Sequence, residues 1–135
     1  MKRAAIVSPI RTGVGKYLGA LSDMTAGELG AVVLKALVER TGIDPHRIDD
    51  VIFAQGYASG EAPCIARYSL LAAGLPIEIP GYQLDRRCGS GLQAVIDAAM
   101  MVQTGVADVV IAGGVESMSN AEYYTNDISQ CNISR

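Results

Sequence analysis

The sequence is poor in the residues that several kinds of site require. It has no tryptophan, one phenylalanine and one histidine, and its three cysteines are scattered. A lone histidine among scattered cysteines does not form the ligand cluster that zinc needs, so we expect no metal. No apolar run reaches the roughly 18 residues of a membrane-spanning helix, so we expect no membrane contact. The net charge of −3 argues against nucleic acid as a partner, because phosphate binding needs a clustered basic face.

The cysteines are also too few and too irregularly placed for a disulfide framework. Their number is odd, and no pair has the CxxC spacing. We therefore expect a reducing, cytoplasmic compartment. Half of the 135 residues are apolar, mostly Ala, Val, Ile and Leu, and glycine is frequent. This composition suits one closely packed domain of sheet and helix.

The apolar segments predict an alternation of strands and helices. We expect strands over residues 4–7, 51–54, 81–87 and 108–115, and helices over residues 25–42, 63–74 and 92–102. The order β-α-β-α-β-α-β has crossovers long enough for parallel pairing. It predicts an α/β fold with a mixed, mainly parallel sheet and helices on both faces. The run 108–115 closes on two glycines and has the pattern of a central strand.

Helix ends carry the clearest local signals. Thr25 and Glu28 are spaced as a capping box, Gly42 is suited to end the same helix, and Gly105 is suited to end the helix over residues 92–102. Pro63 fits the first turn of the next helix. The helix over residues 92–102 has only two polar side chains, which is more apolar surface than one sheet face can cover. We expect this surface to drive association where it is left exposed.

The stretch DRRCGSGLQAV, residues 85–95, places a cysteine where a predicted strand turns into a helix. Backbone N–H groups at a helix start lack intrahelical partners and the helix dipole is positive there, so a thiolate at Cys88 is stabilised. One of the two preceding arginines can add to this charge. Gly89 and Gly91 leave bare backbone, which lets a substrate carbonyl approach and leaves N–H groups for an oxyanion. Cys88 is therefore the candidate nucleophile.

Other interpretations of the same residues stay open. Cys88 can be a small residue buried at a tight turn. Residues 89–94 fit the GxGxxA dinucleotide fingerprint, although no apolar strand runs straight into the first glycine. Cys64 lies near the start of another predicted helix, after Pro63, without flanking glycines, and Cys131 lies in a polar tail, so we expect neither to be the nucleophile. His46, in a polar turn, is badly placed as the base that a cysteine nucleophile usually works with.

Three stretches together resemble the amino-terminal domain of the thiolase family. They are IVSPIRTGVGKYLGAL near the start, DRRCGSGLQAV around the cysteine, and AGGVESMSN after the last predicted strand. Together with the β/α order they span the chain at the spacing of that family. Two local departures are Asp85, where the family usually has Asn, and Gly13, where it usually has Pro. A larger departure is length, because thiolase subunits are much longer.

The resemblance implies a thiolase-like fold and an acyl-CoA acetyltransferase activity. Cys88 would attack an acyl-CoA thioester to form an acyl-enzyme, with its backbone N–H in an oxyanion hole. A second acyl-CoA would then condense with the acyl group, or, in reverse, CoA would cleave a 3-oxoacyl-CoA. Coenzyme A thioesters are implied as substrates and no cofactor is implied. A homodimer or homotetramer is the implied assembly.

The resemblance also implies that this chain is incomplete as a catalyst. Residues 1–118 match the amino-terminal α/β domain, and residues 119–135 would begin a loop domain that is cut short. The catalytic His and second Cys of thiolases lie in the carboxy-terminal half, so this chain alone is expected to be inactive and to need that half as a partner. Two alternatives stay open: a 3-ketoacyl synthase-type condensing enzyme, and a non-catalytic fragment that pairs with intact subunits.

Overall fold

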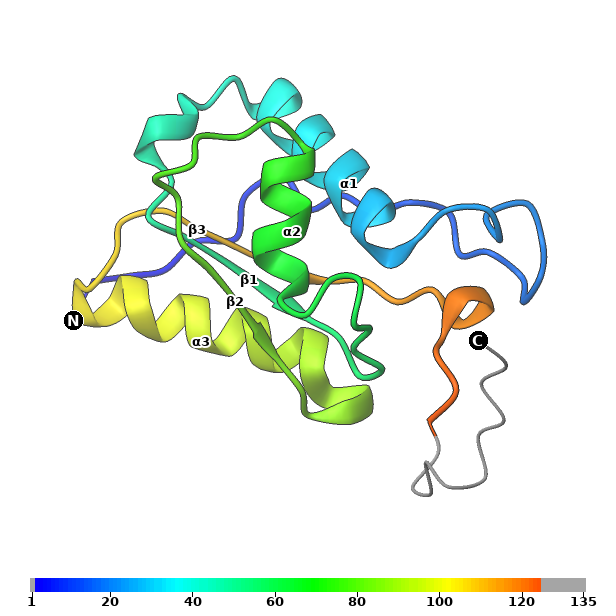
Figure 1. The fold of residues 1–135 in the computed structure, drawn as a ribbon. Coiled ribbons are helices and arrows are strands. Elements are labelled where there is room, and N and C mark those ends of the chain that lie inside the picture. The colour runs from blue at the N-terminus through cyan, green and yellow to red at the C-terminus, as the bar shows by residue number, and fades with distance from the viewer. Residues whose placement is uncertain (1, 125–135) are drawn as a thin grey trace.

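The computed structural model describes residues 2–124, and its centre is a three-stranded parallel sheet (Figure 1). The strands lie in the order β2-β1-β3, with bounds β1 Asp50–Ala54, β2 Gly81–Leu84 and β3 Val110–Gly114. In the register of the sheet, Val51 lies level with Gly81 on one side and Ile111 on the other. Because both pairings are parallel, the carboxyl ends of all three strands meet at one edge.

Three helices cover both faces of this sheet (Figure 1). Their bounds are α1 Ala26–Thr41, α2 Ile65–Ala72 and α3 Ser90–Thr104. Helices α1 and α2 pack on one face, and α3 packs on the other. The predicted α/β class, with a parallel sheet between helices, is confirmed.

Helix ends follow their local signals. The Glu28 N–H donates to Thr25 Oγ1 (3.2 Å) and the Thr25 N–H donates to Glu28 Oε2 (2.8 Å), so the capping box at the start of α1 is confirmed. Gly42 follows α1 with a φ of 62°, and Gly105 follows α3 with a φ of 80°. Both glycines adopt the left-handed conformation that other residues avoid, which ends the helices where the sequence predicts.

The sheet face under α1 and α2 holds most of the core. Leu34 of α1 and Leu70 of α2 are fully buried there, in one cluster with Phe53 of β1. Burial of each leucine stabilises the fold by about 2 kcal/mol. Gly30 lets the two helices approach closely, because a Cβ on it would lie 2.3 Å from Ser69 Oγ of α2.

The face under α3 holds a smaller core. Its buried residues are Ile52 of β1 with Ala94 and Ala98 of α3. Three larger apolar side chains of α3, those of Leu92, Ile96 and Met100, are exposed, and Leu92 is 68% exposed. As predicted, α3 carries more apolar surface than the sheet covers.

The predicted first strand is wrong. Residues 4–7 are neither helix nor strand in the structure, and Ile6 is 79% exposed. The Lys2 N–H donates to Gln103 O (3.2 Å), but within the described residues none of residues 4–7 pairs with β3. A short apolar run forms a strand only where a neighbouring edge satisfies its backbone groups. The observed order therefore begins with α1.

The strand order and two further element boundaries differ from the prediction. β3 is an edge strand of the described sheet, and β1 is central, because an apolar run does not by itself determine strand order. The extended segment expected over 81–87 is a strand only as far as Leu84. Pro63 precedes α2, whose N-cap is Cys64.

Some of the predictions fall beyond the described residues. Cys131 and most of the predicted loop-domain segment lie in residues 125–135. Among residues 2–124, no helix is long and apolar enough to cross a bilayer.

Candidate active site

Cys88 lies in the turn between β2 and α3, just beyond the edge where the parallel strands end. After β2 the chain makes one 3-10 turn, Arg87–Gly89, and α3 begins at Ser90. The Cys88 side chain is exposed to solvent. The thiol therefore stands just before a helix start, as predicted, and the alternative of a cysteine buried for packing is wrong.

A buried serine fixes this turn. Ser90 is 4% exposed, and its Oγ accepts the Arg86 N–H (2.6 Å) and donates to Arg87 O (2.7 Å). The Gly89 N–H also donates to Arg86 O (3.0 Å). These bonds hold the backbone on both sides of Cys88. Sequence reasoning missed this role, although a serine at the first position of a helix commonly bonds to nearby backbone.

The backbone around the thiol is accessible. Within the described residues the Cys88 N–H has no hydrogen-bond acceptor, so it can donate to a bound oxygen. A Cβ on Gly91 would meet nothing within 4 Å, and one on Gly89 would meet only the Arg86 side chain, at 3.9 Å. This agrees with the prediction that the two glycines leave room for a substrate carbonyl.

The two arginines before the thiol have partners other than the sulfur. The Arg86 guanidinium donates to Gln93 Oε1 on α3. The Arg87 guanidinium donates to Gly56 O and forms an ion pair with Asp85, with 3.0 Å between Nη1 and Oδ2. The expectation that one arginine supports the sulfur directly is not met by these contacts.

An open hollow of about 390 Å³ adjoins the Cys88 turn. It lies at the carboxyl ends of β1 and β3 and at the start of α3, where open α/β sheets usually bind ligands. Arg87, Ser90 and Gly91 form the part of its wall nearest the thiol, and Gly113 and Glu116 belong to the wall on the β3 side. The thiol itself lies beside this wall rather than in it.

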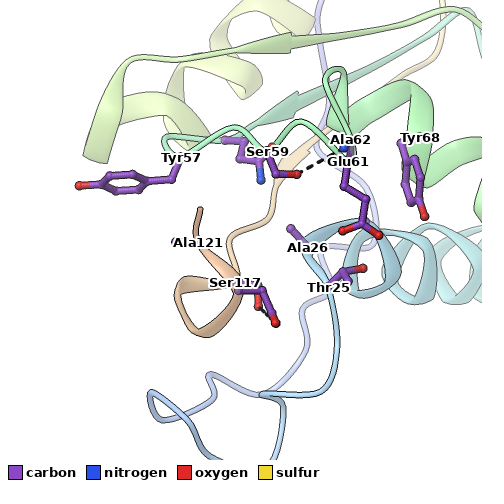
Figure 2. A pocket seen from close by; sticks show the side chains of 12 residues that line it. Thr25, Ala26, Tyr57, Ser59, Glu61, Ala62, Tyr68, Ser117 and Ala121 are labelled. Carbon is purple, nitrogen blue, oxygen red and sulfur yellow. Dashed lines mark hydrogen bonds between the residues drawn. The ribbon is translucent and has the colours of Figure 1, made fainter. Parts of the chain in front are cut away.

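A second, smaller pocket of about 20 Å³ lies between the start of α1 and the loop before α2. In Figure 2, Ser59 and Glu61 of that loop lie opposite Thr25 and Ser117 across the pocket. Buried Gln55 lines both this pocket and the hollow, and its Oε1 has no hydrogen-bond partner among the described residues. Sequence reasoning did not single out Gln55, which looks there like an ordinary polar residue after a strand.

The stretch AGGVESMSN connects the end of β3 to the loops around the hollow. The Glu116 carboxylate accepts the N–H groups of Gly56 (2.8 Å) and Tyr57 (3.3 Å) in the loop after β1. Ser117 Oγ donates to Met24 O (3.0 Å) just before α1. In the sequence this stretch stood out only as part of the family resemblance. Its hydrogen bonds show that it joins loops that are distant in the sequence.

The other candidate residues lie apart from this site. His46 is exposed in the 3-10 turn Pro45–Arg47, before the amino end of β1, whereas Cys88 follows the carboxyl end of the parallel strand β2. His46 therefore lies at the opposite edge of the sheet and is not placed as a base. Cys64 is half-buried, and its Sγ donates to Gly81 O (3.5 Å).

Two further kinds of site find no support in the described residues. No group of three or more His, Cys, Asp or Glu side chains in residues 2–124 could hold a metal ion. The dinucleotide fingerprint requires a strand that runs directly into its first glycine, but β2 ends at Leu84 and Gly89 is the last residue of the 3-10 turn that follows.

Comparison with known proteins identifies relatives across almost the whole chain. The family model described as "Thiolase, N-terminal domain" matches residues 4–134. The acetyl-CoA acetyltransferase of Cupriavidus necator is 44% identical over 123 residues, which are 91% of this chain and 31% of the relative. The steroid 3-ketoacyl-CoA thiolase of Mycobacterium tuberculosis is 47% identical over 120 residues, 88% of this chain and 30% of the relative.

A solved structure shares the fold. The crystal structure of the Bacillus anthracis acetyl-CoA acetyltransferase superimposes with a TM-score of 0.82 and 40% sequence identity, covering 90% of this chain and 31% of that one. The present chain thus spans about a third of the length of the relatives that it matches.

Proposed function

The chain belongs to the thiolase family, and from this premise we propose that it carries the nucleophile of an acyltransferase that acts on coenzyme A thioesters. The observation that carries the proposal is the exposed Cys88, held just before α3 by Ser90 and flanked by bare glycine backbone. In the proposed reaction two acyl-CoA molecules condense, or CoA cleaves a 3-oxoacyl-CoA.

The first proposed step is acylation of Cys88. The thiolate forms a bond from its sulfur to the thioester carbonyl carbon, and the carbonyl oxygen becomes an oxyanion. The Cys88 N–H, which has no acceptor among the described residues, is suited to donate to that oxygen. When the oxyanion collapses, the carbon–sulfur bond to CoA breaks, CoA leaves and takes up a proton, and the acyl group stays on Cys88.

The second step requires groups that the described part of this chain does not place near Cys88. The α-carbon of a second acyl-CoA must lose a proton before it attacks the acyl group, and His46 lies at the far edge of the sheet. We propose that the catalytic His and second Cys that the family resemblance implies belong to a carboxy-terminal part. This chain alone is then inactive.

The same proposal extends to assembly. The uncovered apolar side of α3 supports docking of the carboxy-terminal part there, within a homodimer or homotetramer. We propose that residues 1–118 form the α/β domain and that residues 119–135 begin a loop domain over the substrate. No cofactor is needed beyond the coenzyme A thioesters themselves, and the cysteine usage supports a cytoplasmic protein.

The test is acyl labelling in the assembled protein, meaning this chain with whatever carboxy-terminal part accompanies it in the cell. Brief exposure to acetyl-CoA, quenching in acid and peptide mass spectrometry should reveal an acetyl thioester on Cys88. Cys88→Ser should abolish the label at this peptide, and Cys64→Ser should retain it. Acetylation of Cys64 in place of Cys88, or no acetylation at all, would refute the proposal.

A further inference from the structure

We propose that Arg87 is a positioning residue: its side chain fastens the Cys88 turn to Gly56 in the loop after β1 and so fixes the direction of the Cys88 N–H. This inference rests on the proposed function, because the direction matters only if that N–H stabilises an oxyanion.

The backbone of Arg87 supports this role. Its φ is +49°, in the left-handed region that residues with side chains rarely adopt. Such a conformation persists only where the surrounding contacts hold it. Rotation about this φ angle would turn the next peptide, which carries the Cys88 N–H. The contacts that hold Arg87 therefore also determine where that N–H points.

Every polar group of Arg87 has a partner. Its N–H donates to Asp85 Oδ1 (2.8 Å), and its C=O accepts from Ser90 Oγ (2.7 Å). Its guanidinium pairs with Asp85 Oδ2, donates to Gly56 O and lies over the Tyr57 ring, 5.8 Å from the centroid. Asp85, a local departure from the family pattern, is thus the ion-pair partner that helps hold the left-handed turn.

The loop that receives Arg87 is itself held from the other side. The Gly56 N–H donates to Glu116 Oε2 (2.8 Å), while Gly56 O accepts from Arg87. The two backbones also approach closely, because a Cβ on Gly56 would lie 4.0 Å from the Arg87 Cα. Gly56 is therefore bound by one side chain from the end of β3 and by another from the Cys88 turn.

Arg86 provides a matched control in the same turn. Its guanidinium donates only to Gln93 Oε1 on α3 and does not reach the loop after β1 in the contacts of the structure. Arg86→Leu removes the same charge at the adjacent position without loosening the tie to Gly56.

The experiment measures two rates at Cys88 in the assembled protein. The first is acylation, followed as the single-turnover release of CoA from acetyl-CoA. The second is alkylation by iodoacetamide, followed by peptide mass spectrometry. Alkylation passes through no oxyanion, so it reports on the thiolate and its exposure but not on the direction of the N–H. If Arg87 positions the Cys88 N–H, its substitution should lower the acylation rate and leave the alkylation rate nearly unchanged.

Arg87→Leu should lower the acylation rate by at least about tenfold, while loss of a whole oxyanion donor would cost more. Alkylation should stay within about twofold of the wild-type rate, because the thiol and its exposure are unchanged. Arg87→Lys should resemble Arg87→Leu, since an ammonium keeps the charge but lacks the planar group that lies over the Tyr57 ring while its Nη1 reaches Gly56 O. Arg87→Gly should lose less, because glycine accepts the positive φ. Arg86→Leu should change neither rate.

An equal fall in both rates with Arg87→Leu, restored by Arg87→Lys, would overturn the inference and assign Arg87 an effect of charge on the sulfur. An unchanged acylation rate would also overturn it, and Arg87→Lys provides the same test if Arg87→Leu fails to fold.

The Cys88→Ser variant distinguishes a wrong positioning role from a wrong proposed function. If Cys88→Ser still acylates, the proposed function is wrong; if it is inert while Arg87→Leu acylates normally, only the positioning role is wrong.

Discussion

Helices α2 and α3 are each preceded by a cysteine, yet the two helix starts differ. Cys64, the N-cap of α2, is half-buried, and its thiol donates to Gly81 O. Cys88 lies two residues before α3 and is exposed. A cysteine next to a helix start is thus no evidence of reactivity by itself. The glycine flanks and the serine-fixed turn of Cys88 distinguish it.

The two helices also differ in how much of their apolar surface is buried. α2 buries Ile65, Ala66 and Leu70 completely in the main core, between α1 and the sheet. α3 meets the sheet through the small residues Ala94 and Ala98 and leaves Leu92, Ile96 and Met100 exposed. α2 completes the core of this chain, whereas α3 has an apolar side that no described part of this chain covers.

The largest difference between the two helix starts should appear in turnover. We expect Cys88→Ser in the assembled protein to lower turnover by about a thousandfold or more, because loss of a covalent catalyst costs several powers of ten. Cys64→Ser should keep turnover near the wild-type level, since its thiol makes one contact with backbone. A thiolysis assay with acetoacetyl-CoA measures both.

Circular dichroism is the control for this pair, and both variants should keep the wild-type spectrum. Turnover of Cys88→Ser within about tenfold of wild type would mean that Cys88 is not the nucleophile. A loss confined to Cys64→Ser would reverse the comparison between the two helix starts.

The next largest difference concerns stability. Leu70→Ala on α2 should lower the free energy of unfolding by about 3 kcal/mol, because it leaves a cavity in the main core. Leu92→Ala on α3 removes the same atoms from an exposed side chain and should cost less than about 0.5 kcal/mol. Urea unfolding of this chain, diluted until it no longer associates and followed by circular dichroism, tests both. Equal losses would show that α3 is buried within the chain itself.

Local chemistry explains which parts of the fold could be predicted. The capping box at Thr25 and the terminating glycines Gly42 and Gly105 depend on residues close in sequence, and the structure agrees with each. The room beside Cys88 was likewise predictable from Gly89 and Gly91. The strand over residues 4–7 was predicted wrongly because a strand depends on a neighbouring edge, which a short apolar run does not specify.

In the candidate site, only the place of Cys88 just before a helix start was predictable. Arg87 contacts Gly56, a residue 31 positions away, and Glu116 reaches the same loop from 60 positions away. Pairings at such separations depend on strand order, which an apolar pattern does not determine, and the central position expected for β3 was wrong. The prediction that an arginine supports the sulfur considered only neighbours in sequence, whereas the fold provides Arg87 with a distant carbonyl and Tyr57.

A smaller effect is expected on association. The outward apolar side of α3 should make the 135-residue chain aggregate or bind its carboxy-terminal part, because large exposed apolar patches associate in water. Ile96→Glu together with Met100→Glu should shift the chain towards a monomer in size-exclusion chromatography. Leu71→Glu, at an exposed position of α2, is the matched control and should leave the elution unchanged. A monomeric wild-type chain would remove the reason for a partner on α3.

The smallest effect concerns the connections that follow the two helices. The loop after α2 is held by Arg67, whose guanidinium donates to Ile77 O (3.0 Å) and Ile79 O. The loop after α3 is held by Asp49, whose Oδ2 accepts the N–H groups of Asp108 (2.7 Å) and Val109 (2.9 Å). The backbone N–H groups of Val109 and Asp108 lower the pKa of Asp49 below its ordinary value. Only the second connection should therefore depend on pH in the acidic range.

The stabilisation that Asp49 provides should weaken in acid. Because the pKa of Asp49 is lower in the folded chain than in the unfolded one, its stabilisation is complete above the unfolded value and is lost as the pH falls through the folded value. Because Asp49 is exposed and solvent screens its charge, Asp49→Asn should lower the free energy of unfolding by less than about 1 kcal/mol at neutral pH, and the difference should fade below about pH 4. Arg67→Met should cost a similar amount at both pH values, since a guanidinium keeps its charge throughout. Urea unfolding at neutral pH and near pH 3 measures the four differences. A loss for Asp49→Asn that is equally large at both would mean that the carboxylate charge contributes nothing and that only the shape of the connection matters.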